Sequence, residues 1–196
     1  MEVVTEIVTA RLRLRRFVRE DLPAFVAYRR QPEVARYQSW EDTYSLDDAE
    51  RMFESQEGFA LGQPGDFVQL AILDRATGTM HGDCAVRVLI DQPATAELGV
   101  TLATASQGAG RATEALTAVV SVLFETYGLH RVCAETDDRN PAVHRLFERV
   151  GFRCEGRLVE ADWFKGEWST LRIYALLARE WHAGAPAREP GPYPGR

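Results

Sequence analysis

Lysine is almost missing from this sequence: Lys165 is the single lysine among 196 residues, and arginine supplies the other 22 of the 23 basic side chains. Acidic residues outnumber basic ones by 29 to 23, which gives a net charge of −6. A molecule of this sign repels the phosphate backbone of a nucleic acid, so no nucleic-acid partner is expected. A P-loop is also excluded, because its pattern GxxxxGK(S/T) needs a lysine within a glycine-rich loop.

Cysteine and long apolar runs are scarce as well. Cys84, Cys133 and Cys154 are odd in number and far apart, which indicates reduced thiols rather than a disulfide framework. No apolar run approaches the ~18 residues that a membrane span needs, and the acidic start MEVVTEIV does not resemble a signal peptide. We therefore expect a cytoplasmic protein without a membrane partner.

Two kinds of reactive site have no support in the sequence. There is no GxSxG pattern and no cysteine with an evident base partner, so a covalent nucleophile is not expected. The histidines stand at no metal-ligand spacing from one another or from the cysteines, so no metal is expected. They are His81, His130, His144 and His182.

Apolar periodicity predicts one mixed α/β domain over residues 1–182, followed by a proline- and glycine-rich tail, 183–196, that is expected to be disordered. Strands that follow one another along the chain favour antiparallel pairing. The expected sheet is therefore mostly antiparallel, with about seven strands flanked by helices. The expected strands are 11–17, 66–74, 82–90, 94–103, 131–137, 153–164 and 168–177; the expected helices are 22–31, one after a Ser45 cap, a long one after Gly110, and one opened by Asn140 and closed by Gly151.

The stretch SQGAGRATEAL, residues 106–116, places Gly108 and Gly110 between a strand pattern and a helix pattern. A helix N-terminus presents unpaired N–H groups and a partial positive charge, which suit an anion. Glycine allows close approach of the backbone and positive φ. Ala112 is nearly as small, and Arg111 adds a mobile positive charge. The stretch therefore predicts a phosphate or diphosphate site.

One candidate ligand for this stretch is a dinucleotide. GAGRAT partly imitates the fingerprint GxGxxG/A of nicotinamide-dependent oxidoreductases, but Thr113 stands where a third small residue belongs. That fold also places its motif in a leading strand–helix–strand unit, whereas here about half of the chain precedes it. This alternative remains a weaker one.

The same residues fit another pattern better. Gln107 to Ala112 matches Q/R-x-x-G-x-G/A, the acetyl-CoA diphosphate loop of the GNAT N-acetyltransferases. The chain also resembles the RimJ/RimL-like branch, which acetylates ribosomal-protein N-termini. TARLRLR (9–15) resembles its opening strand, NPAVHRLFERVGF (140–152) its second cofactor segment and REW (179–181) its usual ending.

The resemblance implies the GNAT fold and acetyl-CoA as cosubstrate. In that fold the strand before the glycines splays from the next strand, here ELGVTLA from RVCAETD, and the pantetheine arm fills the gap like an added strand. Asn140 is implied as a cofactor ligand, although it serves equally well as a helix cap. The implied cofactor-binding residues are Thr101, Leu102, Gln107, Gly108, Ala109, Gly110, Arg111, Ala112, Thr113 and Asn140.

Three carboxylates could serve as the catalytic base, Glu97, Asp162 and Glu160, of which the first two are the main candidates, acting directly or through water. Glu97 lies where many members of the superfamily carry a glutamate base, and Asp162 lies near the acidic residue proposed as base in the ribosomal-protein branch. Glu160, two residues from Asp162, is expected on the same strand face. Alternatively, Glu160 and Asp162 simply form the solvated face of an edge strand.

The general acid departs from the family pattern. Phe147 stands where many members carry Tyr, and Val143 where the ribosomal-protein branch often has Ser. Neither can donate a proton. Because a thiolate with pKa near ~8.5 is a tolerable leaving group, acid catalysis is expected either to be dispensable or to be done by water. His144 is a weaker candidate and is expected to point away from the apolar stripe of its helix.

The predicted function is transfer of an acetyl group from acetyl-CoA to a primary amine, by direct attack in a ternary complex. The acceptor is a protein N-terminus or a small-molecule amine, and Tyr37 and Trp40 are implied as walls of its pocket. Equally, the aromatic residues of the stretch 36–44, Tyr37 and Trp40 included, could form a surface cluster that braces a loop. A non-catalytic acyl-CoA-binding regulator is the other alternative. For oligomeric state, only the general prevalence of homodimers applies.

Overall fold

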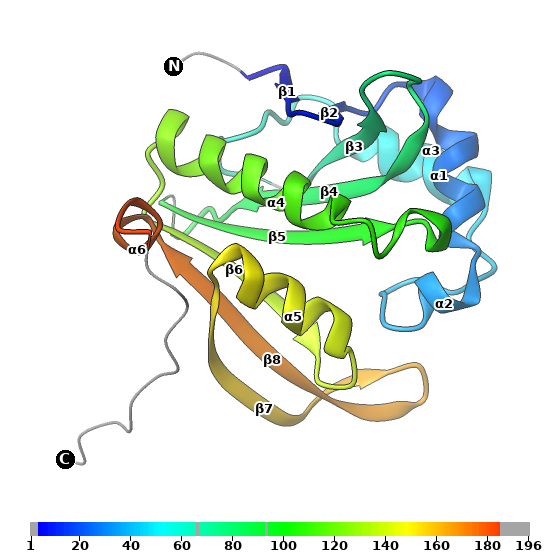
Figure 1. Cartoon of the computed structure of the whole chain (residues 1–196). Coiled ribbons are helices and arrows are strands. Elements are labelled where there is room, and N and C mark those ends of the chain that lie inside the picture. The colour runs from blue at the N-terminus through cyan, green and yellow to red at the C-terminus, as the bar shows by residue number, and fades with distance from the viewer. Residues whose placement is uncertain (1–3, 66, 93, 185–196) are drawn as a thin grey trace.

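The computed structural model of the protein describes residues 4–65, 67–92 and 94–184. Within these residues eight strands form one sheet, in the spatial order β1-β2-β3-β4-β5-β6-β8-β7 (Figure 1). Every neighbouring pair is antiparallel except β5 and β6. The strands are β1 (Glu6–Val8), β2 (Leu12–Arg16), β3 (Val68–Asp74), β4 (Met80–Val88), β5 (Thr95–Leu102), β6 (Arg131–Asp137), β7 (Arg153–Phe164) and β8 (Glu167–Leu177).

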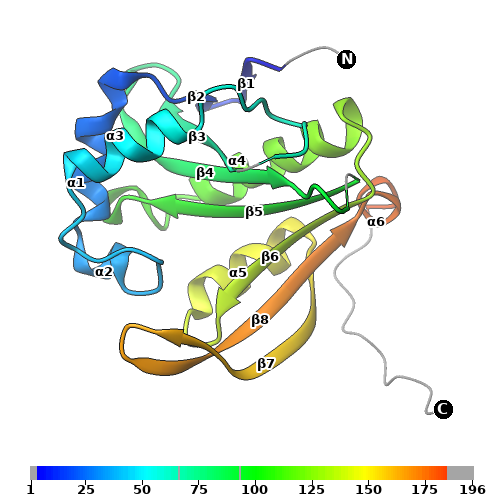
Figure 2. The same cartoon turned by 180° about the vertical axis from the view of Figure 1, so that it is seen from behind.

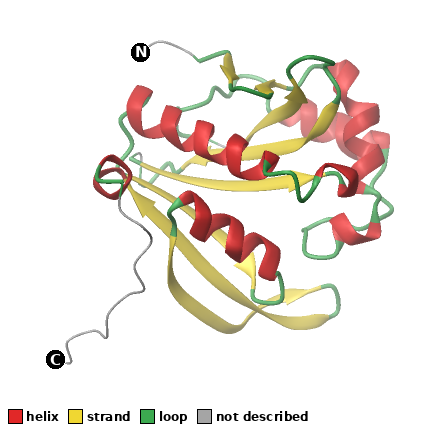
Figure 3. Ribbon diagram, in the orientation of Figure 1, coloured by secondary structure: helices red, strands yellow, loops and turns green. Residues whose placement is uncertain are grey.

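Helices flank the sheet on both faces. Opposite views show α4 and α5 over one face and α1 and α3 over the other (Figures 1 and 2), and Figure 3 shows the same layers by type of element. None of the described helices has the length and apolar character required to cross a membrane. The helices are α1 (Leu22–Arg29), α2 (Pro32–Ala35), α3 (Leu46–Ser55), α4 (Arg111–Ser121), α5 (Pro141–Val150) and α6 (Ala178–His182).

Strand β3 shows how the sheet serves two apolar layers. Leu70 and Ile72 point into the larger core beneath α4 and α5, while Ala71 and Leu73 pack in the smaller core beneath α1 and α3. All four are buried. Burying a leucine or isoleucine side chain is worth about 1.5–3 kcal/mol. Coverage on both faces explains why β3 reads as an almost continuous apolar run.

The predicted boundaries agree closely with the observed longer elements, and the differences lie in the short elements, one helix end and the tail. The short helices α2 and α6 were not predicted. β1 was not predicted, because three residues are too few to show an alternating pattern. The long helix predicted after Gly110 ends at Ser121 and continues as a wider π-helical turn, Val122–Thr126. Most of the predicted disordered tail, residues 185–196, lies outside the described residues.

Local capping positions the helices as the sequence predicts. The Ser45 hydroxyl accepts a hydrogen bond from the Asp48 N–H at 3.1 Å and so caps α3. Asn140 accepts from the Val143 N–H at 3.3 Å, and Gly151, at φ 109°, ends α5 in the left-handed region. Because α5 begins at a fixed point after β6, its first turn lies beside the end of β5.

Strands β5 and β6 diverge along their length. Their parallel ladder contains three pairs, from Thr95 opposite Arg131 to Glu97 opposite Cys133. Beyond that point β5 pairs only with β4, while β6 pairs only with β8. The predicted splay is therefore present, and it leaves the outward-facing backbone groups of Leu98, Val100 and Leu102 without a second strand to satisfy them.

Candidate active site

The glycine loop ends at the N-terminus of α4. Gly108 and Gly110 have φ of 77° and 76°, in the left-handed region that favours glycine. Gly110 is the N-cap of α4, and no side chain caps the helix. A β-carbon at Gly108 would meet no heavy atom within 4 Å. Backbone conformation, rather than crowding within the protein, therefore requires glycine here, and the first-turn N–H groups are left for an anion.

A cleft of about 520 Å³ opens between α2, the end of β5, the glycine loop and α5. Nine of the ten predicted cofactor residues line it, and the exception is Ala109. The tertiary structure thus brings together predicted residues from three separate segments of the chain. The lining residues predicted in advance are Tyr37, Thr101, Leu102, Gln107, Gly108, Gly110, Arg111, Ala112, Thr113 and Asn140.

The charge of the cleft is opposite to that of the whole molecule. Arg111, Arg145 and Arg149 line it, and Glu33 is the acidic residue among its described lining residues. In a chain of net charge −6, this local excess of arginine favours an anionic ligand. Sequence reasoning missed Arg145 and Arg149, although their spacing of four on a predicted helix puts both on one face.

The free edge of β5 forms the inner wall of the cleft. Val100, Thr101 and Leu102 line it, and Thr101 is buried. The Leu102 carbonyl accepts a hydrogen bond from the Gln107 side-chain amide at 3.1 Å, which ties the glycine loop to the strand end. A carbonyl oxygen has two lone pairs, so Leu102 keeps one for a ligand.

Glu97 is engaged away from this cleft. It lies opposite Arg87 on β4, and the two side chains form an ion pair. The Arg87 guanidinium also lies over the Phe67 ring, 4.6 Å from its centroid. Glu97 is not among the described residues that line the cleft. The positive charge of Arg87 therefore neutralises the carboxylate of this candidate base.

Asp162 is differently placed. It lies opposite Ser169 in the β7–β8 hairpin and is half-buried. Its carboxylate makes no hydrogen bond or ion pair with any residue that the structure describes, and it does not line the cleft itself. The expectation that Glu160 shares its strand face was wrong: the register shifts between Leu158 and Asp162, and Glu160 has φ of 50° in this bulge.

The β7–β8 turn contacts the α2 segment, which is α2 together with the loop after it (residues 32–40), through the single lysine. The Lys165 ammonium donates to the carbonyls of Ala35, at 2.9 Å, and Trp40, at 2.8 Å. Both carbonyls belong to the α2 segment, which lines the cleft through Glu33 and Tyr37. Lys165 therefore links the hairpin that carries Asp162 to one wall of the cleft.

Of the two predicted acceptor-pocket residues, Tyr37 lines the cleft and Trp40 does not. The Arg29 guanidinium lies 3.6 Å from the centroid of the Trp40 ring, and the Trp40 indole N–H donates to the Arg29 carbonyl at 3.2 Å. Trp40 also packs edge-on against Tyr44. These contacts fit the bracing role that was the alternative at this position, and a role for Trp40 in an acceptor pocket stays a prediction.

No proton donor replaces the missing general acid on α5. Phe147 is buried against Tyr174, and Val143 lines the cleft with an apolar side chain. His144 does not point away from the apolar stripe as expected: it is buried, stacks on Tyr174 and lies 3.1 Å from the Asp137 carbonyl through Nε2. Burial, followed by the charge of Arg172, lowers the pKa of His144, so it is neutral at physiological pH.

A buried carboxylate lies directly behind the cleft wall, and sequence reasoning missed it. Asp83 on β4 accepts hydrogen bonds from the Tyr28 hydroxyl and, at 2.8 Å, from the Gln69 amide. Arg29 lies 3.8 Å away. Burial raises the pKa of Asp83, and these three partners oppose that effect. The signal available in the sequence was a lone acidic residue within an apolar strand pattern.

Neither a metal site nor a reactive cysteine is evident among the described residues. No group of three or more His, Cys, Asp or Glu side chains there is arranged to hold a metal ion. Cys84, Cys133 and Cys154 are all free thiols, as predicted. Burial raises the pKa of the Cys84 thiol above its ordinary range, so Cys84 is an inert core residue.

Comparison with known proteins identifies the family. Residues 11–153 match the family described as acetyltransferase (GNAT) domain, so the chain belongs to the GNAT acetyltransferases and is an enzyme of that class. Members of this family use acetyl-CoA as donor. The assignment sets aside the dinucleotide and non-catalytic alternatives.

Individual relatives agree with the family. The chain is 27% identical over 174 residues to the N-acetyltransferase p20 of Bacillus licheniformis, covering 88% of this chain and 96% of that one. Over 87 residues it is 31% identical to the ribosomal protein uS5-alanine N-acetyltransferase of Escherichia coli, covering 44% and 45%. Spermidine N-acetyltransferase from Vibrio cholerae, solved with CoA and spermine, shares the fold with a TM-score of 0.77 at 22% identity, covering 89% of this chain and 99% of that one.

Proposed function

We propose that this enzyme transfers the acetyl group of acetyl-CoA to a primary amine, by direct attack in a ternary complex. The observation that carries the proposal is the arginine-lined cleft, where the N-terminus of α4 meets the unpaired edge of β5. The diphosphate of CoA fits the first-turn N–H groups of α4 and Arg111, since both favour negative charge. The predicted cofactor residues support this assignment, with Ala109 acting through the shape of its loop.

The pantetheine arm is proposed to run along the free edge of β5. Its amide groups can pair with the outward-facing backbone of Val100 and Leu102 as an added strand would. The expectation that Thr101 supplies backbone groups was wrong, because Thr101, like Thr95 and Ala103, turns its N–H and C=O toward β4. The apolar side chains of Val100, Val143 and Leu146, which line the same cleft, can cover its hydrocarbon part. A backbone N–H of β5 then lies near the thioester carbonyl and stabilises the negative charge that develops on its oxygen.

The acetyl transfer needs a base before the nucleophile attacks. An amine with pKa near ~10 is mostly protonated at neutral pH, so a proton must leave the nitrogen. The nitrogen lone pair then forms the new C–N bond, the C–S bond breaks, and water protonates the thiolate. We propose Asp162 as the base, directly or through water, because its carboxylate has no partner among the described residues, whereas Arg87 neutralises Glu97.

The proposed acceptor is a primary amine that enters beside α2. Tyr37 and Gln38 supply polar groups there, and Glu33 supplies a negative charge that attracts a cationic amine. Two classes of amine fit this description: the N-terminus of a protein, as for the uS5-alanine acetyltransferase, and a small polyamine, as for the spermidine acetyltransferase. The free thiols support a cytoplasmic setting for either class.

Two measurements test the proposal. In a thermal-shift titration, acetyl-CoA and CoA should stabilise the protein, and NADH at the same concentration should not. Thiol release is then measured with a peptide that begins with alanine, with spermidine and with buffer alone. Stabilisation by NADH alone, or no thiol release with any amine across a broad panel, would contradict the proposed function.

A further inference from the structure

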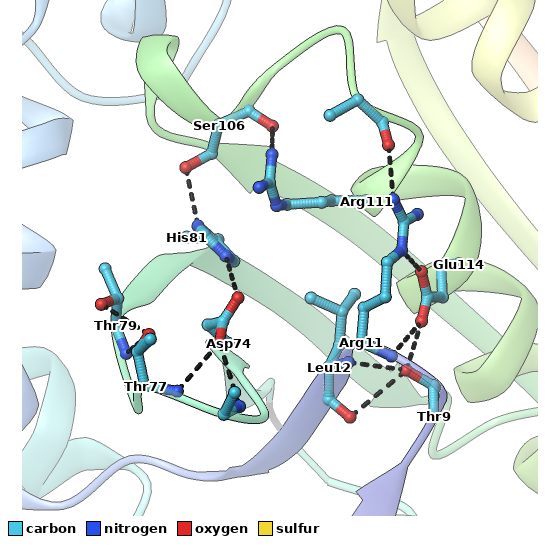
Figure 4. Close-up of polar contacts among 12 residues, drawn as sticks. Thr9, Arg11, Leu12, Asp74, Thr77, Thr79, His81, Ser106, Arg111 and Glu114 are labelled. Atoms are coloured by element: carbon cyan, nitrogen blue, oxygen red, sulfur yellow. Dashed lines mark hydrogen bonds and ion pairs between the residues drawn. The ribbon is translucent and has the colours of Figure 1, made fainter.

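The turn between β1 and β2 contacts the start of α4, about a hundred residues further along the chain (Figure 4). Thr9 and Arg11 form one side of this contact, and Glu114, in the first turn of α4, forms the other. None of these three side chains is among the described residues that line the cleft. The contact therefore lies behind the proposed diphosphate loop.

Glu114 is held by both of its carboxylate oxygens. Oε1 accepts from the Thr9 hydroxyl at 2.6 Å and from the Arg11 backbone N–H at 2.9 Å, and Oε2 accepts from Arg11 Nε at 2.6 Å. Burial would raise the pKa of Glu114, but these hydrogen bonds outweigh it and hold the pKa below its usual value. Glu114 is thus ionised at neutral pH and anchors the Arg11 guanidinium.

The anchored guanidinium reaches the glycine loop. Arg11 Nη1 donates to the Ala109 carbonyl at 3.0 Å. In a trans peptide the carbonyl and the following N–H point in opposite directions, so this bond directs the Gly110 N–H away from Arg11. Gly110 lines the cleft and Ala109 does not. Ala109, the one predicted cofactor residue that does not line the cleft, therefore has its carbonyl turned toward Arg11 on the far side of the loop.

The other end of the loop is held separately. The Ser106 hydroxyl lies 2.9 Å from His81 Nδ1, and His81 Nε2 lies 3.5 Å from an Asp74 carboxylate oxygen (Figure 4). Between Ser106 and Ala109 the chain passes through Gly108, which has wide conformational freedom. A loop of this kind presents its N–H groups in one arrangement only if both of its ends are restrained.

We propose that Arg11 is a positioning residue for diphosphate binding, because its hydrogen bond to the Ala109 carbonyl holds the glycine loop in its binding shape. The inference rests on the proposed function, since it assigns a role toward CoA. The Arg11 side chain is 53% exposed and the Glu114 side chain 18%. Without the guanidinium, the Thr9 hydroxyl and the backbone N–H of residue 11 still donate to the Glu114 carboxylate, so the loss of stability should be modest. Loss of the guanidinium should therefore appear in ligand affinity rather than in folding.

The test compares Arg11→Ala with Arg13→Ala. Arg13 lies two residues further along, in β2, is 42% exposed and forms an ion pair with Glu6 at 3.5 Å. It therefore resembles Arg11 in exposure and in having an acidic partner, but no hydrogen bond within the described residues joins it to the loop. We expect Arg11→Ala to raise the calorimetric Kd for CoA about tenfold. The rate with S-acetylpantetheine, an acetyl donor without the diphosphate, should stay within twofold of wild type, and Arg13→Ala should change neither quantity.

Several outcomes would overturn the inference. An unchanged Kd for CoA in Arg11→Ala would remove the role of Arg11 while leaving the proposed function intact. An equal loss with S-acetylpantetheine would indicate general damage rather than loop positioning. Arg11→Lys should recover part of the affinity, because lysine can reach one of the two acceptors. If wild type binds neither CoA nor acetyl-CoA, the proposed function and this inference both fail.

Discussion

Asp83 and Thr101 lie opposite each other where β4 pairs with β5, so a buried carboxylate stands directly behind the wall of the cleft. Tyr28 and Gln69 donate to that carboxylate, which joins α1 and β3 to the strand next to the cleft. Buried carboxylates are costly unless they are satisfied by hydrogen bonds. The free edge of β5 is therefore backed by a rigid polar network.

Removal of the Tyr28 hydroxyl should destabilise the protein in a pH-dependent way. We expect Tyr28→Phe to lower the free energy of unfolding by about 1.5–3 kcal/mol at pH 7, because an ionised buried group loses a donor. Burial raises the pKa of Asp83, so the folded protein takes up this proton at a higher pH than the unfolded chain. The contribution of this group to stability therefore increases as the pH falls from neutral toward ~4, and the penalty of Tyr28→Phe should shrink over that range.

Urea unfolding at several pH values measures this difference, with Tyr127→Phe as the control. The Tyr127 hydroxyl accepts a hydrogen bond from the Val4 N–H at 3.0 Å, a contact between neutral groups. Its loss should cost about 0.5–1.5 kcal/mol at every pH. A Tyr28→Phe penalty that is constant with pH would show that Asp83 is not the group responsible.

A valine at Gly108 should reduce both stability and acetyl-CoA affinity, whereas a valine at a comparable glycine outside the loop should reduce stability alone. Gly108→Val should lower the free energy of unfolding by about 1–2 kcal/mol, since φ is 77° there, and should weaken acetyl-CoA binding at least tenfold. Gly78→Val is the control, because Gly78 has φ of 75°, no heavy atom within 4 Å of its β-carbon position, and a place in the β3–β4 turn. Equal losses of affinity in both variants would argue against a diphosphate site at the loop.

The paired arginines of α5 predict recognition of the 3′-phosphate of CoA, which is the group that dephospho-CoA lacks. Arg145 and Arg149 lie one turn apart and line the cleft, and Arg149 reaches Thr113 of α4 at 3.5 Å. We expect the double alanine variant to bind CoA about tenfold more weakly while its affinity for dephospho-CoA is unchanged. Arg51→Ala on α3, outside the cleft, serves as control. Equal losses for both ligands would place these arginines at the diphosphate or show a general effect.

The two candidate bases predict opposite kinetic results. Asp162→Asn should lower kcat by about 10²–10⁴, with the Kd for acetyl-CoA unchanged. Glu97→Gln should leave kcat within about threefold of wild type, because Glu97 is engaged with Arg87. The reverse result, loss of activity in Glu97→Gln alone, would assign the base to Glu97.

Much of the fold follows from local signals. The strands from β2 to β8 show apolar patterns long enough to recognise, and Ser45, Asn140 and Gly151 mark helix ends by hydrogen bonds within a few residues. Gly108 and Gly110 are visible for the same reason, since positive φ is a property of a single residue. The predicted cofactor segments could therefore be named before their arrangement was known.

Several parts of the site could not be predicted because they depend on contacts between distant residues. Glu160 looks like a regular strand residue until the bulge in β7 is seen. Trp40 fits an acceptor wall until Arg29 is found against its ring. Whether side chains such as these face a ligand or another part of the protein depends on residues that are distant in the sequence.

The sequence by itself determined the caps at Ser45, Asn140 and Gly151, the left-handed glycines and the family, because each depends on residues that are neighbours along the chain. Only the tertiary structure decided that Arg11 holds the Ala109 carbonyl, that Asp83 stands behind Thr101, and that the cleft is positive in an acidic protein. These relationships join segments up to about a hundred residues apart. No pattern within one segment encodes them, since they arise when the sheet brings its strands together.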